Sequence, residues 1–282
     1  MRFPRRRRLH LSILLLPAVL LVGTAGARAA VPARIVSTNL CTDQLAVALI
    51  GTERLASVSF LAADPTLSNV VDAVRDLPAN HALVEEIARF DPDLVLAGAH
   101  RERRLNDRLR RLGYRVHALA APNSLAELRR AVTDLAAVLG VPERGAALIA
   151  GMERDLAALA ADAGAARPTA LVYRPNGYTS GAGTLVDEVM RLAGFDNLAA
   201  RSGVAGGGNL SLESLVVAAP DLIVFDNPGE RGWSLAQRLQ AHPVLDRLRP
   251  GTRFVALPGR LWVCAGPWIV EAAARLRAAR NR

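Results

Sequence analysis

The sequence predicts an α/β protein made of two parallel-sheet lobes, joined by one long backbone helix, with a ligand cleft between the lobes. Three observations predict this fold. A short phrase occurs twice at a fixed spacing, apolar strand-like runs alternate with helical segments, and one long helical segment lies between the two halves of the chain.

The repeated phrase reads LVEEIARFDPDLVL over residues 83–96 and SLESLVVAAPDLIV over residues 211–224. At a constant offset of 128 residues, Glu85 matches Glu213, and the Pro-Asp-Leu after one matches the Pro-Asp-Leu after the other. Each copy has a carboxylate early in a short helix, a Pro that ends the helix, and an apolar run typical of a buried strand. A helix–turn–strand unit used twice predicts two similar lobes with a binding site between them.

Elements of the first half alternate between strand and helix. We expect strands at 34–37, 55–59, 94–97 and 114–119, and helices after the loop 38–43, at 84–90 and at 106–112. Gly113 directly follows the last of these helices, where glycine commonly ends a helix. This alternation through short turns favours a parallel sheet.

The middle of the chain is helical at 124–139 and 142–163. Pro142 suits the first turn of the second helix, and Gly151 within it weakens the helix slightly. A helix of about 22 residues spans roughly 33 Å, enough to join two lobes. We therefore place the N-terminal lobe at 30–140, the linking helix at 141–164 and the C-terminal lobe at 165–282.

The second half repeats the alternation. Strands are expected at 170–174, 222–226 and 253–257, with a loop at 175–183, a helix at 184–193 and a glycine-rich stretch at 203–208. A loop with Trp233 follows the second strand, and the segment 261–267 precedes a final helix. We expect Trp233 and Trp268 to be packing residues.

The first 29 residues have the pattern of a secretory signal peptide. An Arg cluster precedes an apolar run from Leu11 to Val22, and small residues ending in Ala27-Arg28-Ala29 follow it. The run is short for a membrane span, which takes roughly 20 residues. We expect export by the general secretory or the twin-arginine route, with an uncleaved anchor as the alternative.

Charge and composition exclude several classes of function. Residues 1–29 hold six Arg and no acidic residue, so the formal charge falls from +9 to +3 without them and does not indicate a nucleic-acid partner. The chain has no Lys, which excludes a Walker A loop and a pyridoxal-phosphate Schiff base. It also lacks a G-x-S-x-G motif. We expect a binding protein and not an enzyme.

These features together resemble the periplasmic substrate-binding proteins of cobalamin and ferric-siderophore importers. The resemblance rests on the R-I-V-S strand after the signal, the E-x6-P-D-L phrase in both lobes, the T-S-G run at 179–181 and the W-x4-P run at 262–267. It covers essentially the whole mature chain. It implies a periplasmic monomer with little hinge motion that delivers a metal chelate to an ABC permease dimer with its ATPase subunits.

In this family, one Glu on each lobe pairs with Arg of the permease, and the resemblance assigns that docking role to Glu85 and Glu213. Two exposed carboxylates on similar lobes suit two symmetric basic sockets. The alternative is that both are ordinary first-turn carboxylates, with Ser211 as an N-cap. We expect cargo release to follow docking, as the permease pulls the lobes apart.

Candidate cargo contacts are the aromatic residues just beyond predicted strand ends, because metal chelates are large and partly flat. These residues are Phe60, Tyr178 and Trp262. Polar candidates on the same loops are Asn39, His100, Arg101, Arg174 and Arg260, of which the Arg residues suit an anionic cargo. His81, His117 and His242 are too widely spaced to predict a dedicated metal-ion site.

The two cysteines lie in loops at opposite ends of the chain, Cys41 in the first loop and Cys264 in the last. An oxidising compartment favours one disulfide between them. Two free thiols that contact the metal of the cargo are the other arrangement, and the sequence leaves both open.

Two other classes of function remain as alternatives. One is a periplasmic hydrolase that uses Ser180 or a cysteine with His100 or His242, although no spacing supports a nucleophile beside an oriented base. The other is an interaction protein that kept the fold without a ligand. We expect no intrinsic cofactor. The bound cargo is expected to be an iron chelate, haem or a corrinoid, and the sequence does not choose among them.

Overall fold

The computed structural model describes residues 30–160, 167–226, 242–248 and 250–281. The predicted signal peptide, residues 161–163 of the predicted linking helix and Trp233 lie outside this part of the chain. Residues Val31–Arg282 form one compact unit. None of the helices in the described ranges is long and apolar enough to cross a membrane.

The N-terminal lobe is built on a five-stranded sheet in the order β3-β2-β1-β4-β5, with every neighbouring pair parallel. Its strands are β1 (Ile35–Ser37), β2 (Leu55–Ser59), β3 (Ala79–Asn80), β4 (Leu94–Gly98) and β5 (Val116–Leu119). Its helices are α1 (Leu40–Ile50), α2 (Val71–Val74), α3 (Val84–Ala88), α4 (Arg103–Arg111), α5 (Leu125–Val138) and the 3-10 turn η1 (Phe60–Ala63).

The C-terminal lobe repeats this topology with a four-stranded parallel sheet in the order β11-β10-β6-β8. Its strands are β6 (Thr169–Tyr173), β8 (Asp196–Asn197), β10 (Leu222–Asp226) and β11 (Arg253–Leu257). Its helices are α7 (Leu185–Leu192), α8 (Leu198–Arg201), α9 (Leu212–Ala218), α10 (Ile269–Arg280) and the 3-10 turns η2 (Pro175–Gly177), η4 (Pro243–Leu248) and η5 (Gly259–Leu261). The order β8-β6-β10-β11 matches β2-β1-β4-β5, so the two lobes share one connectivity.

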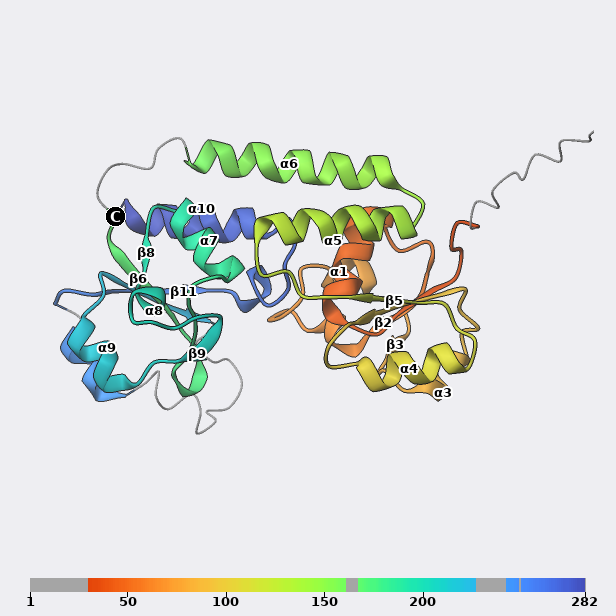
Figure 1. Ribbon diagram of the computed structural model, residues 1–282, viewed down its shortest axis with the longest axis horizontal. Helices are drawn as coiled ribbons and strands as arrows, with labels where there is room; N and C mark the ends of the chain where they lie inside the picture. The colour runs from red at the N-terminus through yellow and green to blue at the C-terminus, as the bar shows by residue number, and fades with distance from the viewer. Residues whose placement is uncertain (1–29, 161–166, 227–241, 249, 282) are drawn as a thin grey trace, which may run out of the picture. The chain divides into compact units, whose positions relative to one another are not determined.

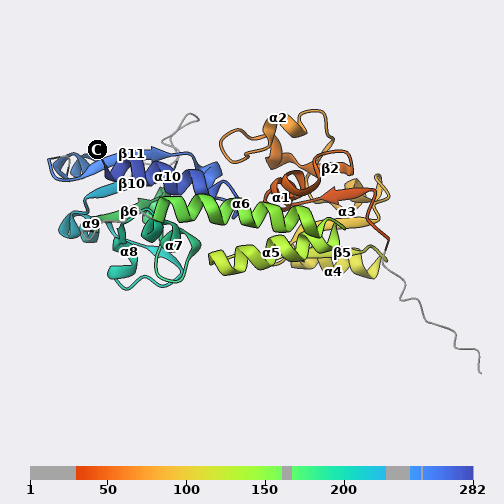
Figure 2. The ribbon, with the colours of Figure 1, turned by 90° about the horizontal axis from the view of Figure 1, so that it is seen from above.

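Helix α6 (Pro142–Ala160) runs across both lobes, as Figures 1 and 2 show. It packs on α5 and α1 of the first lobe and on α10 and α7 of the second. Met152 and Leu156 of α6 belong to one apolar core that includes strand residues of both sheets. Smaller cores cover the opposite faces of the sheets, under α3 and α4 in one lobe and under α8 and α9 in the other (Figure 1).

The Pro-Asp of each repeat copy fixes the start of a central strand pair. The Asp93 carboxylate accepts hydrogen bonds from the backbone N–H groups of Ala33 (2.7 Å) and Arg34 (3.1 Å), just before β1. The Asp221 carboxylate accepts from the backbone N–H (2.7 Å) and hydroxyl (2.9 Å) of Thr169, the first residue of β6. The parallel pairs β1–β4 and β6–β10 are thus anchored by the same residue type in both lobes.

Most expected elements are present, and the strands at 55–59, 222–226 and 253–257 have the predicted bounds. The expected loop at 175–183 was wrong in part, because residues Tyr178–Ser180 form strand β7. This strand pairs antiparallel with β9 (Gly207–Asn209), which comes from the glycine-rich stretch. Glycines carry no side-chain alternation, so no pattern revealed β9. Strand β3 is too short to give a periodic signal.

Besides α6, a disulfide and several hydrogen bonds join the two lobes within the described part of the chain. Cys41 and Cys264 form a disulfide with a Cα–Cα distance of 5.0 Å, one of the two arrangements left open by the sequence. In addition, the Asn69 side chain donates to the carbonyl of Arg260 and accepts from its guanidinium, both at 2.7 Å. These contacts join the first lobe to the segment that precedes α10.

The disulfide should stabilise the fold, because it links residues 223 positions apart in the sequence. Replacing both cysteines, Cys41→Ser with Cys264→Ser, is expected to lower the free energy of unfolding by about 2–4 kcal/mol. Urea unfolding of the variant, of the unaltered protein, and of the unaltered protein with reductant would measure this loss. Equal stability in all three samples, with two reactive thiols in the unaltered protein, would contradict the prediction.

Candidate functional site

A cavity of about 830 Å³ lies between the two lobes. Its volume is within the range of roughly 300–1,000 Å³ that small-molecule sites usually have. All five strands of the N-terminal sheet contribute residues from their carboxyl ends, where parallel sheets bind ligands. The second lobe contributes the end of β6, strand β7, the start of α7 and the segment around Trp262.

The N-terminal wall of the cavity carries a stacked pair of rings. Phe60, at the end of β2, stacks on His81, at the end of β3, with ring centroids 5.0 Å apart and an interplanar angle of 22°. Phe60 is 50% exposed, so one side of the pair is open to a ligand. The sequence predicted Phe60 as a cargo contact but considered His81 only in setting aside a dedicated metal-ion site.

The C-terminal wall combines a cation with two aromatic rings. The Arg174 guanidinium lies 6.0 Å from the ring centroid of Tyr178 and 5.9 Å from that of Trp262, within reach of a cation–π interaction. It also donates to Ser180 Oγ at 2.9 Å. These contacts orient a positive charge beside two flat apolar surfaces, an arrangement suited to a flat ligand with anionic substituents.

Asn39 lines the cavity, but its amide is engaged within the protein. Its Oδ1 caps α1 by accepting from the backbone N–H of Cys41 (3.0 Å), and its Nδ2 donates to Glu102 Oε1 (2.9 Å). Glu102, which the sequence analysis did not single out, also accepts from Thr38 Oγ1 (2.7 Å) and from the backbone N–H of Gly98 (3.0 Å). Glu102 therefore ties the loops after β1 and β4 together.

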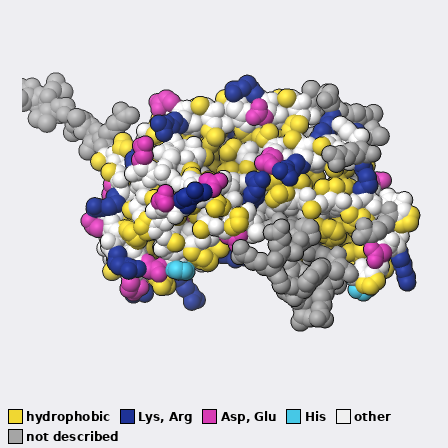
Figure 3. Space-filling view, turned by 180° about the vertical axis from the view of Figure 1, so that it is seen from behind, with side chains coloured by type: hydrophobic (Ala, Val, Ile, Leu, Met, Phe, Trp, Pro, Cys, Tyr) yellow, Lys and Arg dark blue, Asp and Glu magenta, His cyan; other side chains and the backbone are white. Residues whose placement is uncertain are grey.

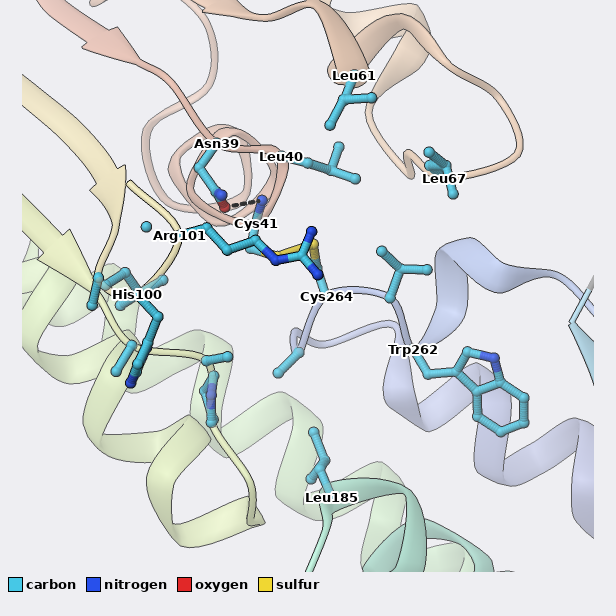
Figure 4. A pocket seen from close by; sticks show the side chains of 18 of the residues that line it. Asn39, Leu40, Cys41, Leu61, Leu67, His100, Arg101, Leu185, Trp262 and Cys264 are labelled. Carbon is cyan, nitrogen blue, oxygen red and sulfur yellow. Dashed lines mark hydrogen bonds between the residues drawn. A yellow bond between two sulfur atoms is a disulfide. The ribbon is translucent and has the colours of Figure 1, made fainter. Parts of the chain in front are cut away.

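The other polar candidates divide into two groups. His100 and Arg101 are exposed on the loop after β4 and line the cavity, with Arg101 drawn among the lining side chains in Figure 4. Arg260 does not belong to the lining. Its guanidinium is 2.7 Å from Asn69 Oδ1 and 3.6 Å from Glu271, so it joins the lobes beside the cavity.

Several side chains that a hydrolase would use have other partners in the described part of the chain, including both cysteines, which form the disulfide. Ser180 Oγ accepts from Arg174, which cannot serve as a general base, and His242 Nδ1 accepts from the backbone N–H of Val244 at 3.2 Å. The described residues contain no group of three or more His, Cys, Asp or Glu that could hold a metal ion.

Comparison with known proteins agrees with this geometry. Residues 35–251 match the family model described as periplasmic binding protein. The chain belongs to this family. A cobalamin-binding protein of Halobacterium salinarum is 30% identical over 162 residues, which span 56% of this chain and 44% of that protein. The match therefore covers less than half of the length of this relative.

Solved structures of similar fold include two haem-binding proteins. A periplasmic haem-binding protein of Pseudomonas aeruginosa is 26% identical with a TM-score of 0.69, covering 88% of this chain and 92% of that one. The periplasmic haem-binding protein RhuT of Roseiflexus sp. RS-1 in apo form is 25% identical with a TM-score of 0.70, covering 87% and 98%. Their two-lobe architecture is the one found in this periplasmic binding protein.

The paired carboxylates Glu85 and Glu213 are both exposed, in the first turns of α3 and α9. Figure 1 shows both helices on the side of the sheets opposite to α6. Glu85 lies 3.8 Å from Arg108, an exposed pair that contributes little to stability. Hydrogen bonds from its own backbone N–H and from Ser211 lower the pKa of Glu213, so this carboxylate stays ionised at neutral pH.

Asp43 of α1 is fully buried next to the cavity residue Ser59. Burial raises the pKa of Asp43 to about 7, although hydrogen bonds from Ser37 and Ser59 oppose the shift. The Ser59 backbone N–H lies 3.2 Å from both carboxylate oxygens, and its hydroxyl donates to Oδ2. This periplasmic binding protein thus holds a carboxyl group below its cavity that titrates near neutral pH.

The raised pKa of Asp43 predicts a pH-dependent stability. As pH rises from about 4 to 7, the unfolded chain loses this proton while the folded protein keeps it, so the free energy of unfolding falls. Asp43→Asn removes the titration, and its stability relative to the unaltered protein should rise by about 1–4 kcal/mol across this window. Urea unfolding at a series of pH values would measure the change. Asp155→Asn, at an exposed position of α6, is the control. A stability difference that does not vary with pH would contradict the prediction.

Proposed function

We propose that this chain is the periplasmic receptor of an ABC importer and captures a metal chelate of the haem, corrinoid or ferric-siderophore type. The observation that carries the proposal is the interlobe cavity with stacked rings on one wall and Arg174 between two aromatic rings on the other. The cobalamin-binding relative and the haem-binding neighbours support the same class of cargo.

The proposed mechanism is binding without chemistry. The flat faces of Phe60, Tyr178 and Trp262 would contact the ring system of the cargo, and Arg174 with Arg101 would contact its anionic groups. The protein would reach the periplasm through the N-terminal signal peptide expected from residues 1–29. It would act as a monomer, since two different lobes already enclose the cavity.

Docking to the permease would use Glu85 and Glu213. Two exposed carboxylates occupy matching places in two lobes that share the order of four strands. A permease dimer offers two equivalent surfaces, so a pseudo-symmetric pair of charges can contact both at once. Exposed charges of this kind mainly accelerate and orient association.

Cargo binding can be tested by tryptophan-fluorescence titration with haemin, cyanocobalamin and ferrichrome. We expect saturable quenching by one of them and an affinity about tenfold weaker in Trp262→Ala, a loss of about 1.4 kcal/mol. Arg174→Gln should weaken the binding of haemin, which carries two carboxylates, more than the binding of cyanocobalamin, which carries no net charge. Arg201→Gln, at an exposed position of α8, is the control. Absence of quenching by all three probes would refute the proposed cargo class.

Docking can be tested with the double variant Glu85→Gln/Glu213→Gln and the importer reconstituted in lipid nanodiscs. Association should slow by about tenfold and lose most of its salt dependence, because the steering charges are removed. Affinity for cargo should stay unchanged. Glu143→Gln, at the exposed start of α6, is the matched control. An unchanged association rate in the double variant would show that docking uses other residues.

A further inference from the structure

The docking helix of the N-terminal lobe and the cavity wall belong to one short segment, residues 80–86. Asn80 and His81 line the cavity, and Glu85 lies four residues after His81. The buried Asn80 side chain anchors the segment, since its Nδ2 lies 2.8–3.0 Å from Ser37 O, Ser57 Oγ and Val58 O. Its Oδ1 accepts from the N–H of Ala82, whose positive φ of 60° turns the chain towards α3.

Glu86, near the end of this segment, contacts His81 near its start. Its carboxylate, 20% exposed, accepts from the backbone N–H of His81 at 2.6 Å and lies 3.2 Å from His81 Nδ1. These contacts hold the imidazole against Phe60, so Glu86 sets the position of the stacked pair that forms the N-terminal wall. Glu85 and Glu86 are neighbours in a helix of five residues. A movement of α3 that repositions one also repositions the other.

In the C-terminal lobe, the two-stranded ribbon β7–β9 connects helix α9 to the cavity wall. Tyr178 of β7 pairs with Asn209 of β9. The backbone of Gly207 passes so close to the Tyr178 ring that a Cβ at this position would lie 2.1 Å from the phenol oxygen. Leu210 donates to the carbonyl of Gly177 at 2.9 Å, and α9 with Glu213 begins two residues later. A displacement of α9 therefore pulls on the strand that positions Tyr178.

Contacts between the lobes limit how far the lobes can separate, which would be the other way to open the cavity. The disulfide Cys41–Cys264 lines the cavity and fixes the distance between the loops that carry it. The pair Asn69–Arg260 joins the lobes nearby. The lobes can rotate about the disulfide, but they cannot move apart there while it is intact, which argues against release by separation of the lobes at this point.

We infer that docking is coupled to the cargo site within each lobe, by Glu86 acting as a positioning residue for the Phe60–His81 pair and by the β7–β9 ribbon acting on Tyr178. Displacement of α3 and α9 by the permease would move both walls and loosen the cargo while the disulfide stays intact. This inference rests on the proposed function, because it takes Glu85 and Glu213 as the docking residues.

Reciprocity provides a test that needs no permease. If docking changes cargo affinity, then cargo must change the affinity for the permease by the same factor, and in this inference it does so by restraining α3 and α9. We would measure amide hydrogen exchange of α3 and α9 with and without haemin, cyanocobalamin or ferrichrome, whichever binds. Bound cargo should slow exchange in both helices by roughly threefold or more, with α6, which contributes no residue to the cavity lining, as the reference segment of the same protein.

Two variants test the coupling in each lobe separately, and each serves as the control for the other. Glu86→Gln, which keeps the side-chain size, should abolish the cargo-dependent protection of α3 and leave that of α9. Gly207→Ala, which displaces Tyr178, should abolish the protection of α9 and leave that of α3. His81→Ala should reproduce the effect of Glu86→Gln while the Glu86 carboxylate remains. Thermal unfolding would show that each variant is folded under the conditions of the measurement.

The outcomes distinguish this inference from the proposed function. Cargo that binds without slowing exchange in α3 or α9 would overturn the inference and leave the receptor function standing. Loss of protection in both helices with either single variant would also overturn it, since the coupling would not be confined to one lobe. Binding of none of the three probes would overturn the proposed function and the inference with it.

Discussion

The carboxylates of Asp93 and Asp221 set the geometry on which the rest of the molecule depends. Each accepts hydrogen bonds from residues at or just before the start of the neighbouring strand, and so fixes the register of the central pairs β1–β4 and β6–β10. In a parallel sheet the register decides where each loop leaves the carboxyl edge. The loops at that edge hold many of the cavity residues, among them Asn39, Phe60 and Arg101. The hydrogen bonds of Asp93 and Asp221 at the amino-terminal edge of the sheets thereby help to position the ligand site at the opposite, carboxyl edge.

Shared connectivity does not make the two walls of the cavity alike. The N-terminal wall presents the Phe60–His81 pair, whereas the C-terminal wall presents Arg174 between Tyr178 and Trp262. A flat cargo would therefore meet the Phe60–His81 pair on one wall and Arg174 between two rings on the other, with Arg101 of the first lobe as a further cation. Figure 3 shows acidic and basic side chains interspersed on the face seen from behind, so the charges on that outer face are not divided between the two lobes.

The repeat was sufficient to predict the two lobes, because its periodicity and its Pro-Asp both indicate the same local helix–turn–strand unit. The same reasoning placed Phe60, Tyr178 and Trp262 beyond strand ends, where the structure has them lining the cavity. It could not find Glu86 or Glu102, whose roles come from contacts with backbone groups and side chains brought close only by folding. Arg260 resembled a cargo residue in sequence, yet its guanidinium pairs with Asn69, 191 positions away. The ribbon β7–β9 was missed because glycines carry no pattern.

The interlobe disulfide has a topological consequence beyond its effect on movement. Together with the main chain it closes a covalent ring that contains α6 and most of both lobes, since the linked residues are 223 positions apart. A single cut by a protease anywhere between residues 41 and 264 would open this ring but would not divide the molecule. The two halves would stay connected through sulfur, and a nicked receptor could keep both walls of its cavity in place.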